Sequence, residues 1–170
     1  MTRTILARAT AILLFIASTA VTAAPFPIGP LTLDWPEGFA FKAARPPYFE
    51  VSGPQGTEVE AQIFSVPATQ MAASEAKYFA KLQKFAEQFM LSSRTFDRPD
   101  VPLAKETLPD GSALFYLGRQ IFSSEYLLEF MIISRHGRIC RMTIQSKGKV
   151  FEGMTKFRPL FDSVRWELQN

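Results

Sequence analysis

The feature that most constrains the fold is a series of apolar, strand-like segments between Leu103 and Ser146. Three turn signals divide this stretch: Pro109-Asp110-Gly111-Ser112, Ser123-Ser124-Glu125 and Arg135-His136-Gly137-Arg138. Turn-forming residues between short apolar runs are typical of hairpins. The pattern therefore predicts a meander of consecutive antiparallel strands over Leu103–Leu108, Ala113–Phe122, Tyr126–Ser134 and Ile139–Ser146.

The central strands of this meander are apolar on both faces. Leu128 and Phe130 alternate with Leu127 and Met131, so neither face suits water. A sheet of this kind must be covered on both sides. An amphipathic helix is predicted from Gln70 to Leu91, with an apolar stripe at helical spacing, and a shorter one from Val150 to Phe161.

The residues before the long helix read as extended segments. Leu31–Asp34, Phe39–Lys42 and Tyr48–Ser52 are strand-like, and a Gly-Pro-Gln-Gly turn follows at residues 53–56. From Thr57 onward apolar residues alternate with polar ones, which predicts a half-buried strand paired with its predecessor. A last strand is expected from Ser163 to Leu168. The predicted fold class is thus α+β, with a central antiparallel sheet, one long helix and one short helix.

The N-terminus predicts export. Arg3 and Arg8 precede an apolar stretch from Ala9 to Ala20, and small residues then lead to Pro25. A charged start, a short apolar run and small residues are the parts of a secretory signal peptide. We expect residues 1–23 to be removed, 24–30 to form a proline-rich extended leader, and 31–170 to form a single globular domain. The expected location is periplasmic or secreted, with no integral membrane segment after cleavage.

Charge and cysteine content narrow the function. Without Arg3 and Arg8, the 19 basic residues fall to 17 against 16 acidic residues, a net charge of +1. This balance predicts no nucleic-acid partner. The one cysteine, Cys140, excludes an intramolecular disulfide, and the one asparagine, Asn170, leaves no glycosylation sequon. Both features favour a bacterial envelope over a eukaryotic extracellular space.

The order of predicted elements resembles the PsbP-like superfamily of small α/β/α sandwiches. Residues 137–144, Gly-Arg-Ile-Cys-Arg-Met-Thr-Ile, resemble its late strand. Residues 157–166, Phe-Arg-Pro-Leu-Phe-Asp-Ser-Val-Arg-Trp, resemble its terminal helix and the strand that follows. The resemblance covers about Leu31 to Leu168. It implies a binding or accessory role in a larger complex, and it implies no catalytic residue.

Few residues carry chemistry of their own. A nucleophilic pair of Cys140 with His136, the one histidine, would span roughly 13 Å of extended strand at about 3.3 Å per residue. Cys140 is therefore expected to be a buried, inert thiol. Glu58 and Glu60 lie about 6.6 Å apart on one face of a strand, which suits a carboxylate pair or simply a solvated polar face. We expect no catalytic residue, no metal site and no cofactor.

The long loop from Ser92 to Pro102 is the predicted binding site. Charged residues alternate there around an aromatic ring, as in an interface anchor or a solvated loop. The candidate contact residues are Arg94, Phe96, Asp97, Arg98 and Asp100.

The expected function is a non-enzymatic exported binding or accessory protein that acts on a protein partner in the bacterial envelope, of assembly-factor or inhibitor/immunity type. A small-ligand or lipid-binding module and a hydrolase with an unrecognised site are the alternatives. The oligomeric state stays open.

Overall fold

The structure is a computed structural model that describes residues 24–66, 75–92 and 98–167. The signal-peptide prediction and the start of the predicted long helix fall on residues outside this part of the chain. No helix of the described residues is long and apolar enough to cross a membrane.

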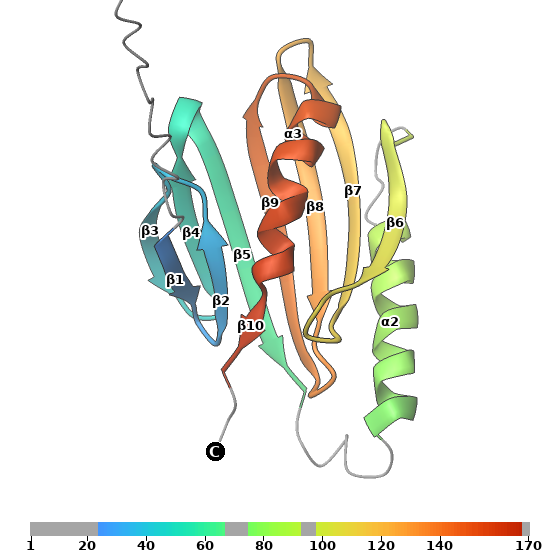
Figure 1. Ribbon diagram of the computed structural model, residues 1–170. Helices are drawn as coiled ribbons and strands as arrows, with labels where there is room; N and C mark the ends of the chain where they lie inside the picture. Colours follow the sequence, from blue (N-terminus) through green and yellow to red (C-terminus); the bar gives the residue numbers. More distant parts are fainter. Residues whose placement is uncertain (1–23, 67–74, 93–97, 168–170) are drawn as a thin grey trace, which may run out of the picture.

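A seven-stranded antiparallel sheet forms the centre, in the order β3-β4-β5-β9-β8-β7-β6 (Figure 1). The predicted meander is confirmed, because β6, β7, β8 and β9 are neighbours in chain order, and β4 and β5 form the predicted hairpin across a short 3₁₀ turn, Pro54–Gly56. The strands are β3 Ala40–Arg45, β4 Tyr48–Gly53, β5 Thr57–Ser65, β6 Val101–Thr107, β7 Ala113–Phe122, β8 Glu125–Ile133 and β9 Arg138–Lys147.

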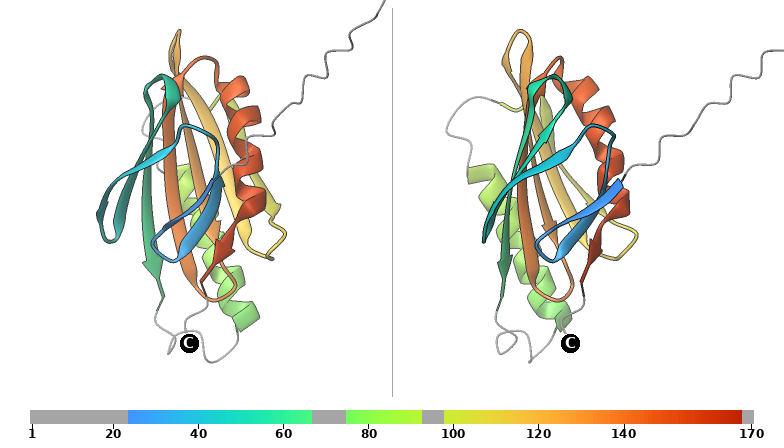
Figure 2. Two further views of the ribbon diagram at one scale, coloured as in Figure 1. Left: turned by 60° about the vertical axis from the view of Figure 1, so that its left-hand side comes forward. Right: turned by 90° about the vertical axis from the view of Figure 1, so that its left-hand side faces the viewer.

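Two helices lie on opposite sides of this sheet (Figure 2). Helix α2, Glu75–Ser92, packs Leu82, Ala86 and Met90 against one face of β7, β8 and β9. On the other face, α3, Val150–Phe157, packs with Phe157 fully buried. The predicted α+β class with a long and a short helix is confirmed. The short helix tightens at Arg158 into a 3₁₀ segment that runs to Ser163, and Pro159 lies in its first turn.

A second sheet joins the α3 side, and the sequence did not predict it. Strand β2, Leu31–Trp35, pairs with β1, Ala24–Ile28, on one edge and with β10, Arg165–Trp166, on the other. The residues expected as a leader thus form β1, where Ile28 is fully buried. Trp35 stacks between Phe26 and Phe39, with ring centroids 5.0 and 5.7 Å away. These stacked rings pack the small sheet against the core.

The strand register assigns each side chain to one of two faces. Val59 and Ala61 of β5 face the α3 side and are buried. Glu58, Glu60 and Gln62 alternate with them and therefore face the α2 side.

Candidate functional site

The predicted binding loop is described only at its end. Arg94, Phe96 and Asp97 lie outside the described residues. Arg98 is exposed, and Asp100 is exposed with one carboxylate oxygen, Oδ2, accepting a hydrogen bond of 2.7 Å from the backbone N–H of Gln120. Asp100 therefore anchors the loop to β7, a role that its position in an alternating charge pattern does not reveal.

Gln120 holds that end of the sandwich together. Its amide nitrogen donates to the carbonyl oxygens of Phe122, Glu125 and Gly148 at 2.8 to 2.9 Å. Its amide oxygen accepts from the backbone N–H of Val150 at 3.0 Å, at the start of α3. A half-buried polar residue thus links two hairpin strands and a helix. Three apolar residues next to it or to its partners in the chain are exposed: Ile121, Phe122 and Phe151.

His136 and Cys140 do not form a catalytic pair. Cys140 is fully buried among core residues of the α3 side, and burial raises the pKa of its thiol to about 12. His136 is exposed in the β8–β9 turn, where its Nδ1 lies 3.3 Å from a carboxylate oxygen of Glu75. The described residues contain no group of three or more metal-ligating side chains.

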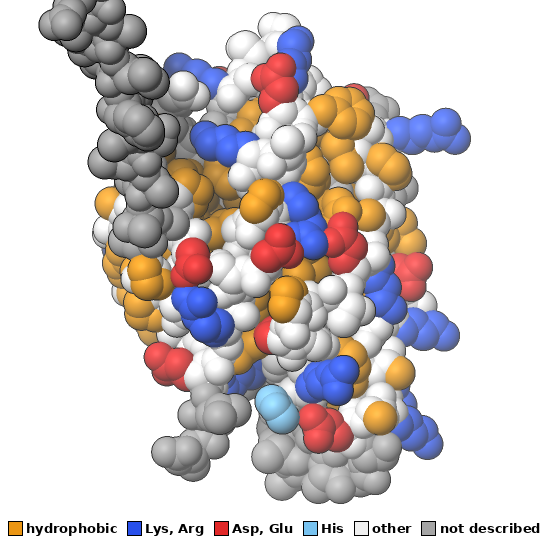
Figure 3. Space-filling model, viewed as in Figure 1, with side chains coloured by type: hydrophobic (Ala, Val, Ile, Leu, Met, Phe, Trp, Pro, Cys, Tyr) orange, Lys and Arg blue, Asp and Glu red, His pale blue; other side chains and the backbone are white. Residues whose placement is uncertain are grey.

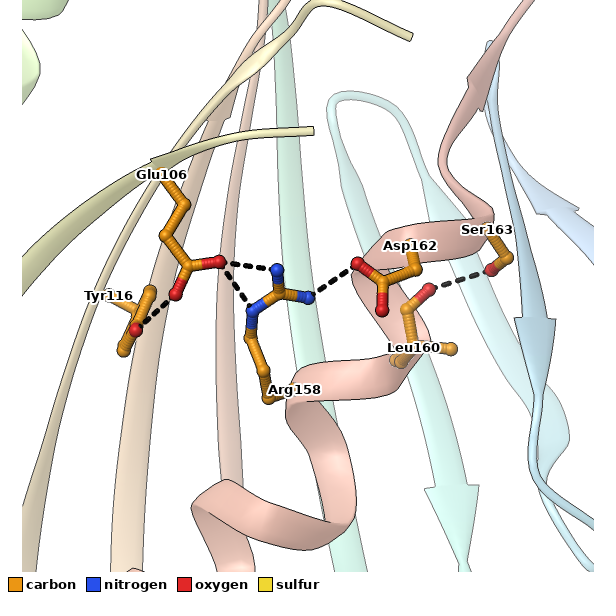
Figure 4. A network of polar contacts seen from close by, with 6 residues as sticks. All are labelled: Glu106, Tyr116, Arg158, Leu160, Asp162 and Ser163. Atoms are coloured by element: carbon orange, nitrogen blue, oxygen red, sulfur yellow. Dashed lines mark hydrogen bonds and ion pairs between the residues drawn. The ribbon is translucent and has the colours of Figure 1, made fainter. Parts of the chain in front are cut away.

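A polar network on the α3 side ties the C-terminal segment to the sheet (Figure 4). The Arg158 guanidinium donates to Oε2 of Glu106 through Nε at 2.8 Å and through Nη2, and to Asp162 through Nη1 at 2.8 Å. The Tyr116 hydroxyl donates to the other oxygen of Glu106. The hydrogen bond from Arg158 lowers the pKa of Glu106, whereas burial and the Glu106 carboxylate raise the pKa of Tyr116.

This network suits structure better than catalysis. A tyrosine with a raised pKa is a poor base at neutral pH, and both Glu106 oxygens already accept hydrogen bonds. Two open hollows of about 490 and 440 Å³ also occur on the described surface, the first of them beside Asp162 of this network. Half of the described residues that line each hollow are charged: Asp34, Lys156, Asp162 and Arg165 in the first, Glu75 and Arg135 in the second. Acidic and basic side chains also stand next to each other over the centre of the α3 side (Figure 3).

A further surface lies on the opposite side of the sheet. Helix α2 packs over β7 and β8, so the α2-side faces of β4 and β5 lie beyond it. We name this surface, with the adjoining face of β9, the open sheet face. Its residues are Tyr48, Glu50, Glu58, Glu60, Gln62, Phe64, Arg141 and Thr143, which the strand register places on one side. A hollow of about 150 Å³ lies between Tyr48, Gln62, Arg141 and their neighbours.

Aromatic side chains border the open sheet face. Tyr48 is 58% exposed, Phe64 is 42% exposed, and Phe85 on α2 is 52% exposed. The Phe89 ring lies 5.9 Å from that of Phe85 and 5.3 Å from the Arg141 guanidinium, so this flank of α2 faces β9. Aromatic rings thus lie on the strands of the open sheet face and on the flank of α2 beside it.

The charge on this surface is mostly negative. Glu50 and Glu60 are directly opposite each other in the β4–β5 pairing, an arrangement of like charges that destabilises a sheet. Glu58 lies on the same face of β5 as Glu60. Lys42 forms an ion pair with Glu50, with its Nζ 3.7 Å from Oε2 of Glu50. The sequence did show that Glu58 and Glu60 share a face. It did not show that Glu50 joins them, because that depends on the register of the hairpin.

Comparisons with known proteins concern the fold. No protein-family model and no curated protein matches the chain. A crystal structure from Bacteroides thetaiotaomicron VPI-5482 is similar with a TM-score of 0.48 and 8% identity, over 83% of this chain and 46% of that one. This chain thus spans less than half of that protein.

The solution structure of cyanobacterial PsbP (CyanoP) from Synechocystis sp. PCC 6803 is similar with a TM-score of 0.46 and 11% identity. The match covers 88% of this chain and 95% of that one. Neither similarity gives a residue of this chain a role. At this low level of identity the chain is similar in fold to a cyanobacterial PsbP, and its function must be argued from its own side chains.

Proposed function

We propose that this chain is an exported, non-enzymatic binding or accessory protein whose protein partner contacts the open sheet face. The observation that carries the proposal is the group of exposed aromatic side chains there, Tyr48, Phe64 and Phe85, on two strands and the neighbouring helix. Exposed aromatic residues that lie together are typical of interaction sites. Their supports are regular elements, so a partner meets them in a fixed arrangement.

Two other classes of function have less support. A small apolar ligand needs a hollow lined mainly by apolar groups. The hollows of about 490 and 440 Å³ are instead widely open to solvent, and charged side chains are among the residues that line each of them. Hydrolysis by a nucleophile needs an accessible, activated side chain, whereas the Cys140 thiol is buried with a raised pKa.

Site-specific photo-crosslinking in the exporting cell tests the proposal. The photoreactive amino acid p-benzoylphenylalanine replaces Phe64 in one variant and Phe85 in another. We expect both positions to give a covalent adduct with the same protein, because both side chains border the same surface.

Phe41 provides a matched control. It is 45% exposed, close to the value for Phe64, and it pairs with Val51, whose side chain faces the α3 side. The same photoreactive residue at position 41 should give no adduct with that protein. Equal adducts from positions 41 and 64, or none from 64 and 85, would contradict the proposed function.

A further inference from the structure

The open sheet face has room for one helix beside α2. It comprises three neighbouring strands, β4, β5 and β9. Strands are about 4.8 Å apart, so three of them offer a width close to the 10 Å diameter of a helix with side chains. β5 has nine residues, roughly 30 Å at 3.3 Å per residue, which is the length of a helix of about 20 residues.

Apolar contacts for such a helix exist on two sides. Phe64 and Tyr48 would lie beneath it, and Phe85 and Phe89 would lie beside it, on the flank of α2 that faces β9. Neighbouring helices pack 8–10 Å apart through side chains of this kind. A partner helix with one apolar stripe would therefore bury rings that are now exposed.

The edge of the sheet is a poorer docking site. β3 is the outer strand on this side, and a partner strand could pair only with its free edge. A register shift between Phe41 and Ala43 interrupts β3, and Lys42 and Arg45 are exposed along it. Irregular pairing and charges are the features by which edge strands avoid adding another strand.

The acidic and aromatic residues of the open sheet face lie at opposite ends of it. Along β5 the face changes from carboxylates at Glu58 and Glu60 to an aromatic ring at Phe64. The contact of Glu75 with His136 places the start of α2 at the β8–β9 turn, which is the Phe64 end of β5. The carboxylates therefore lie towards the C-terminal end of α2.

From these features, and resting on the proposed function, we infer that the partner presents an amphipathic helix. Its apolar stripe lies on Phe64, Phe85 and Phe89, and its lysine or arginine residues, gathered at one end, face Glu58 and Glu60. Helix-in-groove docking is a common mode of peptide recognition. The paired basic residues would offset the repulsion between Glu50 and Glu60 that the free protein carries.

Synthetic helical peptides test this inference without a known partner. The probe is an 18-residue peptide with a leucine stripe on one face and four lysines confined to one end. The matched probe carries four glutamates at the same positions. Fluorescence anisotropy with the mature protein should give at least about tenfold tighter binding for the lysine peptide, with a smaller difference at 1 M salt, where the Debye length is about 3 Å.

Variants separate the apolar and charged contributions. Phe64→Ala combined with Phe85→Ala should weaken both peptides, and Glu58→Gln combined with Glu60→Gln should weaken only the lysine peptide. Equal binding of the two peptides, or lysine-peptide binding that survives the double phenylalanine variant, would overturn the inference. If crosslinks from positions 64 and 85 still reach one protein, the proposed function stands and only the helical, basic partner is wrong.

Discussion

Arg158 contacts Glu106 through two guanidinium nitrogens, and this pair joins the C-terminal end of α3 to the edge strand β6. The two residues are 52 positions apart in sequence, and their side chains are 26% and 34% exposed. Water therefore screens the pair only in part. The interaction holds the C-terminal end of α3 against β6, and the Tyr116 hydroxyl of β7 donates a hydrogen bond to the same Glu106 carboxylate.

Arg158→Ala should lower the free energy of unfolding at pH 7 by about 1 kcal/mol, the scale of a partly exposed charged hydrogen bond. Tyr116→Phe removes one hydroxyl and leaves the ion pair, so its effect should be smaller. Chemical denaturation of the two variants measures both values. An Arg158→Ala protein as stable as wild type would show that the pair does not hold β6.

The same pair predicts a pH dependence. Arg158 lowers the pKa of Glu106 in the folded state, so the contribution is complete above the ordinary glutamate pKa of about 4.3 and is lost as the pH falls through the lower folded value. The stability difference between wild type and Arg158→Ala should therefore shrink between pH 5 and pH 2. A difference that grows with acid would contradict the assignment.

Gly153→Ala should destabilise the protein even though alanine favours helices. A Cβ at this position of α3 would lie 2.4 Å from the ring of Tyr126. Tyr126 is only 2% exposed, so its ring has little room to move away. Overpacking of this kind costs about 1–3 kcal/mol, more than the gain of about 1 kcal/mol from helix propensity. Thermal unfolding measures the change. The control is Thr155→Ala, an exposed position of the same helix, which should change stability far less.

Cys140 should be unreactive in the folded protein. Full burial and a thiol pKa of about 12 leave almost no accessible thiolate at pH 8. Labelling by a disulfide reagent should be slow in buffer and complete within minutes in denaturant. Cys140→Ser should cost about 1–2 kcal/mol, because a hydroxyl then replaces a thiol in an apolar setting, and binding should not change. Fast labelling of the native protein would refute the buried position.

Local patterns were sufficient to predict most of the elements. Alternation at Val59, Ala61 and Ile63 predicted β5 and its buried face, and the turn at Asp110-Gly111 predicted the start of β7. The small sheet was missed for two reasons. The pairing of β2 with β10, such as Thr32 with Arg165, joins the two ends of the described chain, and no local pattern carries that information. The β1–β2 hairpin is local, but its proline-rich first strand predicts an extended leader instead.

The candidate surface was harder to predict for a similar reason. Phe85 and Phe89 fall on the apolar stripe of the long helix, which predicts burial for both. In the structure the sheet contacts the helix mainly through Leu82, Ala86 and Met90, and Phe85 is left exposed. Which part of an apolar stripe is buried depends on the width of sheet that the helix covers. Helix α2 packs over β7 and β8, and the strand order places β5 and β4 beyond it, beside β9. The helix sequence alone does not contain this strand order.

The loop prediction keeps its own test. Arg98 is exposed, so Arg98→Ala removes a surface charge without changing the core. Asp100→Ala instead removes the hydrogen bond from the backbone N–H of Gln120. If the partner contacts only the open sheet face, Arg98→Ala should leave its affinity within about twofold of wild type. A tenfold loss, measured by calorimetry with the crosslinked partner, would return the loop to the interface.

The most direct test of the open sheet face is the affinity of the crosslinked partner for Phe64→Ala combined with Phe85→Ala, measured by calorimetry beside Phe41→Ala. Removal of two interface rings should weaken binding by at least about 2 kcal/mol, the usual scale for anchor residues, or roughly 30-fold. The melting temperature should change little, because both rings are about half exposed and neither belongs to the buried core. Phe41→Ala should bind like wild type. Unchanged affinity in the double variant, or an equal loss in Phe41→Ala, would contradict the account.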